Sequence, residues 1–159
     1  MPNPNQLRRA RFGPRPRTQR YLPHIQLDQW PEPEVFEKLS DGCLALPHVR
    51  ERQSRMSASD TRALWLPDEK ALGPPEAFID DHEFCHVHAL PTGSLHLTLP
   101  SGVRERMIQL EWGESHPSST AGFLAKTLVM IYAPRDDQEL AVVLSLLNVS
   151  CEFAKGTSE

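Results

Sequence analysis

Residues 83–90 (EFCHVHAL) and residues 94–99 (SLHLTL) decide the fold, because side chains alternate strictly along each stretch. Such alternation is typical of a strand that buries only one of its faces. The linker Pro91-Thr92-Gly93 predicts a three-residue hairpin connection, with a glycine available for a positive φ angle. The two stretches are therefore predicted to pair as antiparallel strands.

Helical periodicity marks three other stretches, in which apolar side chains recur at steps of three and four. They are residues 34–46, 101–112 and 137–154. We expect Gly113 to end the second of these helices. Short apolar runs at residues 61–66 and 128–132 predict two further strands.

The order of these elements predicts an α+β fold, with a mainly antiparallel sheet of about four to five strands and three helices packed on one face. Residues 48–60 are expected to form a loop or an edge strand, and residues 114–126 a loop. A chain of 159 residues accommodates one domain, which we expect at residues 31–155, followed by a tail at residues 156–159.

Charge is distributed unevenly along the chain. Overall, 17 Lys and Arg against 21 Asp and Glu give a net charge of −4, which argues against a globally basic nucleic-acid-binding protein. Residues 1–20 contain six arginines and no acidic residue, so the other 11 basic and 21 acidic residues give the rest of the chain −10. We predict a flexible, Pro- and Arg-rich arm at residues 1–30. The alternatives are an arm folded back onto its acidic domain or onto a partner, and a transit peptide.

The cysteines and the hydropathy pattern favour a cytoplasmic protein. Cys43, Cys85 and Cys151 are odd in number and far apart, which argues against a disulfide framework. No stretch approaches the roughly 18 apolar residues of a membrane-spanning helix, so no membrane association is expected.

Three histidines are predicted to share one face of the hairpin. If Cys85 and Val87 point into the core, His86, His88 and His96 project from the opposite face. The expected turn places His88 opposite His96 and His86 opposite Thr98. Cross-strand neighbours lie about 4.5–5.5 Å apart at Cβ, so these imidazoles can share one ligand.

Three interpretations of this face remain open. Imidazoles exchange protons near neutral pH, which suits metal-free acid–base catalysis. They can also provide three Zn or Fe ligands, with Glu114 or His116 as a fourth. In the third interpretation the histidines form a plain exposed or interface surface. Trp65 and Phe84 have the same parity and are expected to supply an apolar wall for a substrate.

Two further spots carry candidate residues. Glu114 and His116 can act as a base and its orienting partner, or simply form a polar helix exit. Arg135 precedes the last predicted helix, where it can anchor an anionic group or pair with Asp136 or Asp137. The chain has no GxGxxG, P-loop or GxSxG motif, so nucleotide-fingerprint and nucleophile-elbow chemistry are not indicated.

The segments EFCHVH, GSLHLTLP, EWGESHP and YAPRDDQEL resemble the luciferase-domain family, a small bacterial and fungal domain of unknown function. The resemblance extends from about Arg62 to Cys151, with Cys85 where the family pattern has glycine. It implies a role beside secondary-metabolite pathways. The light emission in the family's name is not carried over to this chain.

Our leading hypothesis is a cytoplasmic, cofactor-independent enzyme of secondary metabolism. It would use histidine acid–base chemistry for cyclisation, isomerisation or lactone-type reactions on a conjugated polyketide-like or aromatic small molecule. The predicted catalytic residues are His86, His88, His96, Glu114 and His116, with substrate contacts from Trp65, Phe84, Thr98 and Arg135.

Two alternatives stand beside this hypothesis. The first is a non-catalytic module that binds a ligand or a protein through the histidine face, including a homodimer. The second is a metalloenzyme that holds Zn or Fe on His86, His88 and His96.

Overall fold

A six-stranded antiparallel sheet forms the centre of the protein in the computed structural model, which describes residues 7–54 and 61–157. Its order is β1-β2-β3-β4-β6-β5. The strands are Arg50–Gln53 (β1), Arg62–Trp65 (β2), Glu83–Val87 (β3), Leu95–Thr98 (β4), Gly113–Ser115 (β5) and Leu128–Ile131 (β6). The predicted α+β fold is confirmed, with one strand more than expected.

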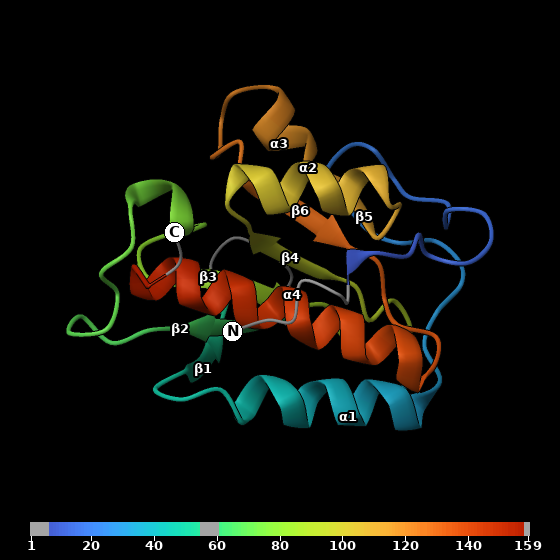
Figure 1. Ribbon diagram of the computed structural model, residues 1–159, viewed down its shortest axis with the longest axis horizontal. Helices are drawn as coiled ribbons and strands as arrows, with labels where there is room; N and C mark the ends of the chain where they lie inside the picture. Colours follow the sequence, from blue (N-terminus) through green and yellow to red (C-terminus); the bar gives the residue numbers. More distant parts are fainter. Residues whose placement is uncertain (1–6, 55–60, 158–159) are drawn as a thin grey trace.

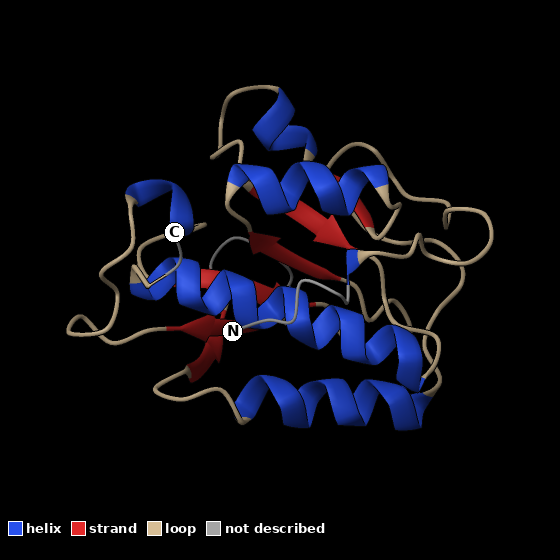
Figure 2. Cartoon of the chain, viewed as in Figure 1, coloured by secondary structure: helices blue, strands red, loops and turns tan. Residues whose placement is uncertain are grey.

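Three long helices cover one face of the sheet (Figures 1 and 2). They are Pro33–Leu44 (α1), Ser101–Gln109 (α2) and Asp137–Lys155 (α4), and two short helical turns, Pro75–Ala77 (η2) and Pro117–Thr120 (α3), lie in connections. The Asp136 carboxylate accepts the Glu139 N–H at the start of α4, which stabilises the exposed end of the longest helix.

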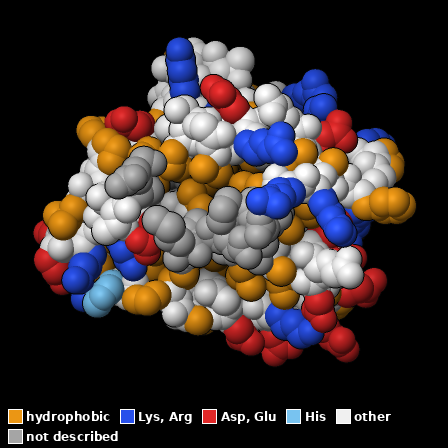
Figure 3. All heavy atoms as spheres, viewed as in Figure 1, with side chains coloured by type: hydrophobic (Ala, Val, Ile, Leu, Met, Phe, Trp, Pro, Cys, Tyr) orange, Lys and Arg blue, Asp and Glu red, His pale blue; other side chains and the backbone are white. Residues whose placement is uncertain are grey.

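The hydrophobic core lies between this face of the sheet and the helices. Leu95, Leu97 and Val129 are fully buried there, against apolar side chains of α4 such as Val143 and Leu147. Each such side chain contributes about 1.5–3 kcal/mol of transfer free energy. On the outer side of the helices, acidic side chains gather at the lower edge, over α1 (Figure 3).

The hairpin pairs with a different register from the predicted one. His86 lies opposite His96 and Val87 opposite Leu95, so the predicted pairing of His88 with His96 is wrong by two residues. The connection is longer than three residues, because the last ladder contact runs from the His88 N–H to the Ser94 carbonyl. A two-residue shift preserves the alternation of faces, so the histidines remain on one side of the sheet.

Two elements occupy the region of residues 114–126, which was predicted as a loop. The second helix ends at Gln109, and Gly113 belongs to β5 instead of terminating that helix. A Cβ atom on Gly113 would lie 2.0 Å from the Met130 carbonyl oxygen, so only glycine allows this close pairing with β6. Three-residue β5 is too short to show a strand periodicity in the sequence.

Residues 7–32, called here the N-terminal segment, lie against the domain beside β5 and β6 (Figure 1). The Gln26 side chain accepts the Ala133 N–H at 2.9 Å, and the Trp112 indole donates to the Arg9 carbonyl at 2.9 Å. These contacts join residues 7–32 to the rest of the domain, whereas residues 1–6 of the predicted arm lie outside the described residues.

The segment predicted as a loop or an edge strand, residues 48–60, contains a short strand. Residues 50–53 of the predicted loop or edge strand form edge strand β1, and residues 55–60 lie outside the described residues, as do 158–159 of the predicted tail. No helix in the described part of the chain is both long and apolar enough to cross a membrane.

Candidate active site

A row of side chains crosses the sheet on the face opposite the hydrophobic core. The register aligns His86 on β3 with His96 on β4, then with Met130 on β6 and Glu114 on β5. Aligned residues of neighbouring antiparallel strands point to the same side of a sheet. The four side chains therefore form one continuous line across the strands.

A bulge in β3 adds a buried carboxylate to this face. Leu64 pairs with Cys85 but Trp65 pairs with Glu83, so Phe84 is the extra residue. The bulge turns Phe84 into the hydrophobic core and lets Glu83 approach His86, with its Oε2 3.4 Å from the imidazole Nδ1. The predicted place of Phe84 beside the histidines is therefore wrong, because strict alternation assumes a strand without a bulge.

Five buried histidines, called here the histidine cluster, gather on this face. They are His24, His86, His88, His96 and His116. His96 lies at the centre, with ring centroids 5.0 Å from His24, 5.0 Å from His86, 4.8 Å from His88 and 4.7 Å from His116. The face that carries them is therefore buried, which disagrees with the plain exposed surface of the third interpretation.

The ring nitrogens of the cluster face one another closely. His96 Nδ1 lies 2.9 Å from His86 Nε2 and 3.1 Å from His88 Nε2, and His96 Nε2 lies 3.0 Å from His24 Nδ1. His116 differs from the others, because its Nδ1 accepts the Ser118 N–H at 3.1 Å and so caps α3.

Burial lowers the pKa of three histidines of the cluster, which favours their neutral form. Loss of water lowers the pKa of His88 to about 3 and that of His116 to about 4, and it lowers the pKa of His96 well below its usual value. A neutral imidazole carries one N–H donor and one nitrogen lone pair, so it can relay a proton or bind a metal ion.

Two groups of three histidines place their ligand atoms within 4.8 Å of one another. One is His86, His88 and His96, and the other is His24, His96 and His116. His96 belongs to both groups because its two nitrogens point in different directions. Either group has the residue types that Zn and other first-row transition metals prefer.

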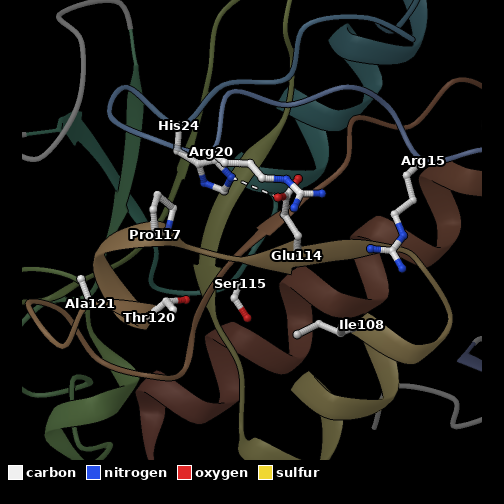
Figure 4. A pocket seen from close by; sticks show the side chains of 9 residues that line it. All are labelled: Arg15, Arg20, His24, Ile108, Glu114, Ser115, Pro117, Thr120 and Ala121. Carbon is white, nitrogen blue, oxygen red and sulfur yellow. Dashed lines mark ion pairs between the residues drawn. The ribbon is translucent and has the colours of Figure 1, made fainter.

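A pocket of about 510 Å³ lies at the outer side of the cluster (Figure 4). His24 and Arg20 reach it from the N-terminal segment, Glu114 and Ser115 from β5, and Thr120 from the end of α3. The Glu114 carboxylate lies 3.6 Å from His24 Nε2. Burial raises the pKa of Glu114, but the neighbouring His24 and Thr18 side chains outweigh it and lower the pKa overall. Glu114 is therefore an ionised, partly exposed carboxylate in front of buried imidazoles.

His24 was missed by the sequence analysis. It stands 62 residues before His86, in a Pro-punctuated stretch without periodicity, and no local pattern links it to the strands. The expected partner of Glu114 was His116, but the structure places His24 beside the carboxylate.

The other predicted substrate-contact residues have partners outside the cluster. Trp65 is buried and stacks with the Arg52 guanidinium, and the Thr98 hydroxyl donates to the Ala77 carbonyl. Arg135 forms a bidentate ion pair with Glu139 and donates to the Phe12 carbonyl. Its guanidinium therefore already has partners within the protein. Its predicted alternative partners were the neighbouring aspartates, and Glu139 takes that role instead.

Comparison with known proteins finds a family whose model matches the part of the chain that carries most of the cluster. Residues 81–150 match the Luciferase domain. The predicted resemblance is confirmed over these residues, a narrower range than expected. The matched residues contain four of the clustered histidines and Glu114, whereas His24 precedes them.

Curated fungal relatives carry the same name. Proteins named Luciferase from Armillaria gallica, Armillaria ostoyae and Armillaria mellea are each 27% identical to this chain over 160 residues. The alignments cover 90% of this chain but only 59% of each relative, so the chain spans about three fifths of their length. No solved structure matches the chain.

Proposed function

We propose that this protein is an enzyme that moves a proton to or from a small conjugated molecule held in the pocket at Glu114. The observation that carries the proposal is the juxtaposition of a partly exposed carboxylate with buried imidazoles at the wall of a pocket of about 510 Å³. A carboxylate that touches the substrate, with an imidazole behind it, is a general base with an orienting partner.

The proposed proton transfer takes place between the substrate in the pocket and Glu114, with His24 and His96 behind the carboxylate. Glu114 accepts a proton from an enolic, phenolic or carbon acid of the substrate and becomes a neutral carboxylic acid. His24 lies 3.6 Å behind Glu114, and its other nitrogen lies 3.0 Å from His96 Nε2. In this arrangement His96 donates to His24 Nδ1, which keeps the His24 proton on Nε2, toward Glu114. The same group returns the proton at another atom, which completes an isomerisation or a cyclisation.

The pocket also suggests the charge of the substrate. Arg15 and Arg20 line it together with Glu114. Guanidinium groups favour anions, and they stabilise the enolate or phenolate that proton removal produces. We therefore propose a polyketide-like or aromatic molecule that carries an acidic hydroxyl or carboxylate group.

Deuterium exchange tests the proposal without knowledge of the full reaction. Conjugated enols and phenols that raise the melting temperature of the protein would be incubated with it in D₂O. Deuterium uptake at carbon would be followed by mass spectrometry after O–H deuterium has been exchanged back in H₂O. Glu114→Gln, which keeps the shape but loses the base, is expected to slow exchange by about 10²- to 10⁴-fold.

Glu105→Gln is the matched control, because Glu105 is exposed on α2. Exchange that is equal in wild type and Glu114→Gln would contradict the proposed base. Binding without any catalysed exchange in wild type would favour the non-catalytic module instead.

A second candidate function is light emission, which the name of the relatives suggests. The 27% identity over 90% of this chain favours it. The same compounds, added in air-saturated buffer, would be monitored for photons, and light from wild type but not from Glu114→Gln would assign emission to this pocket.

A further inference from the structure

We propose that His86, His88 and His96 bind one divalent first-row transition-metal ion beneath the pocket. This inference goes beyond the proton transfer at Glu114. It uses the inner side of the histidine cluster, whereas the proposed base lies at the outer side.

The contacts around His96 Nδ1 are better satisfied by an ion than by hydrogen bonds. Two nitrogens, from His86 and His88, approach this one atom at 2.9 and 3.1 Å. An imidazole nitrogen has a single lone pair, so it accepts one good N–H donor and leaves the second contact poorly satisfied. A cation at the meeting point would use one lone pair from each of the three rings.

The separations also suit metal coordination. With metal–nitrogen bonds of about 2.0–2.1 Å, adjacent ligands of an octahedral ion lie about 2.9 Å apart, and those of a tetrahedral ion about 3.4 Å. The two separations from His96 Nδ1, 2.9 and 3.1 Å, are close to the octahedral value, and all three ligand atoms lie within 4.8 Å of one another. Three histidines on one side of the ion would leave further positions free for water or another ligand.

Glu83 provides the outer partner that such a site needs. Its Oε2 lies 3.4 Å from His86 Nδ1, so a proton on Nδ1 leaves the Nε2 lone pair free for the metal. The carboxylate is fully buried, and within the described residues its Oε1 has no hydrogen-bond partner. A buried carboxylate with an unpartnered oxygen is energetically costly unless a positive charge lies nearby. A bound divalent cation supplies that charge.

His96 also has a partner for the ring nitrogen that does not bind the metal. Metal on Nδ1 requires the proton on Nε2, which lies 3.0 Å from His24 Nδ1. The metal therefore leaves the arrangement of His24 and Glu114 intact, and the two proposals are compatible but independent.

The second histidine group fits a metal less well. His116 Nδ1 accepts the Ser118 N–H, so in the neutral ring the proton is on Nε2 and that nitrogen has no free lone pair. Binding through Nε2 would move the proton to Nδ1, where it would face the Ser118 N–H. The structure therefore favours the group of His86, His88 and His96 over the group that contains His116.

The test uses the full chain without a histidine tag, freed of metal by a chelator. Titration with Co²⁺ is expected to give visible absorption bands that saturate at one ion per chain, and Zn²⁺ should abolish them by competition. His88→Gln is expected to weaken Co²⁺ binding by at least 100-fold, and Glu83→Gln by about 10- to 100-fold. His116→Gln and His48→Asn, an exposed histidine outside the cluster, should bind as wild type does.

A Co²⁺ affinity of wild type no higher than that of His88→Gln would overturn the proposal. Loss of binding in His116→Gln with retention in His88→Gln would also overturn it, because the ion would then belong to the other group. If His88→Gln does not fold, Glu83→Gln decides, and an unchanged Co²⁺ affinity there contradicts the site. None of these readings depends on turnover, so failure of the metal site and failure of the Glu114 base are distinguishable.

Discussion

The two faces of the central sheet come from the same strands but have opposite chemistry. Cys85 and Leu97 pack against the helices, whereas His86 and His96, one residue away on each strand, turn toward the N-terminal segment. Both faces are buried, so burial alone does not distinguish core from site. The apolar face gains free energy by leaving water, while each imidazole on the other face loses hydration that its neighbours only partly replace. We infer that stability comes mainly from one face and function from the other.

The largest expected effect lies on the apolar face. Leu97→Ala removes a fully buried side chain and should lower the free energy of unfolding by about 2–5 kcal/mol in urea denaturation. Leu72→Ala, at a side chain that is 71% exposed, is the control and should change it by no more than about 0.5 kcal/mol. Equal effects of the two variants would show that this face is not the main source of stability.

The attachment of the N-terminal segment over the histidine face should have an intermediate effect. Gln26→Ala leaves the buried Ala133 N–H without its acceptor and should cost about 1–3 kcal/mol, with faster proteolysis within residues 7–32. Gln53→Ala, on exposed edge strand β1, serves as the control. Protease resistance equal to that of wild type would show that Gln26 does not hold the segment in place.

The histidine face itself should tolerate substitution with a smaller loss of stability. His88→Ala is expected to weaken Co²⁺ binding by at least 100-fold and to shift the melting temperature by a few degrees, which for a domain of this size corresponds to about 1 kcal/mol. Calorimetry measures the shift. A loss of stability as large as that of Leu97→Ala would give His88 a structural role and remove the distinction between the faces.

The smallest effect is expected on the outer surface, far from both faces. Lys38 of α1 pairs with Asp137 of α4 at 3.0 Å, and both side chains are more than half exposed. Lys38→Ala should therefore cost about 0.5 kcal/mol or less, and the difference should vanish in 1 M salt. Urea denaturation at low and high salt measures it, and a loss above about 1 kcal/mol would contradict this assignment.

Alternation along the strands was sufficient to predict that the three histidines of the hairpin share a face. It predicted that His86, His88 and His96 lie together, because the side of the sheet depends only on whether a residue is odd or even in the strand. The register was not predictable in this way, since a shift by two residues preserves the alternation. The bulge at Phe84 was also hidden, because nothing in the sequence EFCHVH marks an extra residue.

Contacts between distant parts of the chain explain the rest of what was missed. His24 and Gln26 meet β4 and the residues after β6 only after the chain has folded, so a local pattern does not reveal them. Arg135 was predicted to bind an anion because it precedes a helix, but Glu139, one helical turn later, occupies its guanidinium. Pairings of this kind depend on side-chain geometry that residue spacing leaves undetermined.

The most direct test of the separation between the faces compares two variants in the deuterium-exchange measurement. Leu97→Val should lower the free energy of unfolding by about 0.5–1.5 kcal/mol and leave exchange per folded molecule unchanged. Glu114→Gln should leave stability within about 1 kcal/mol and slow exchange by at least 100-fold. If exchange instead followed stability in both variants, or if Glu114→Gln exchanged as fast as wild type, the account would be contradicted.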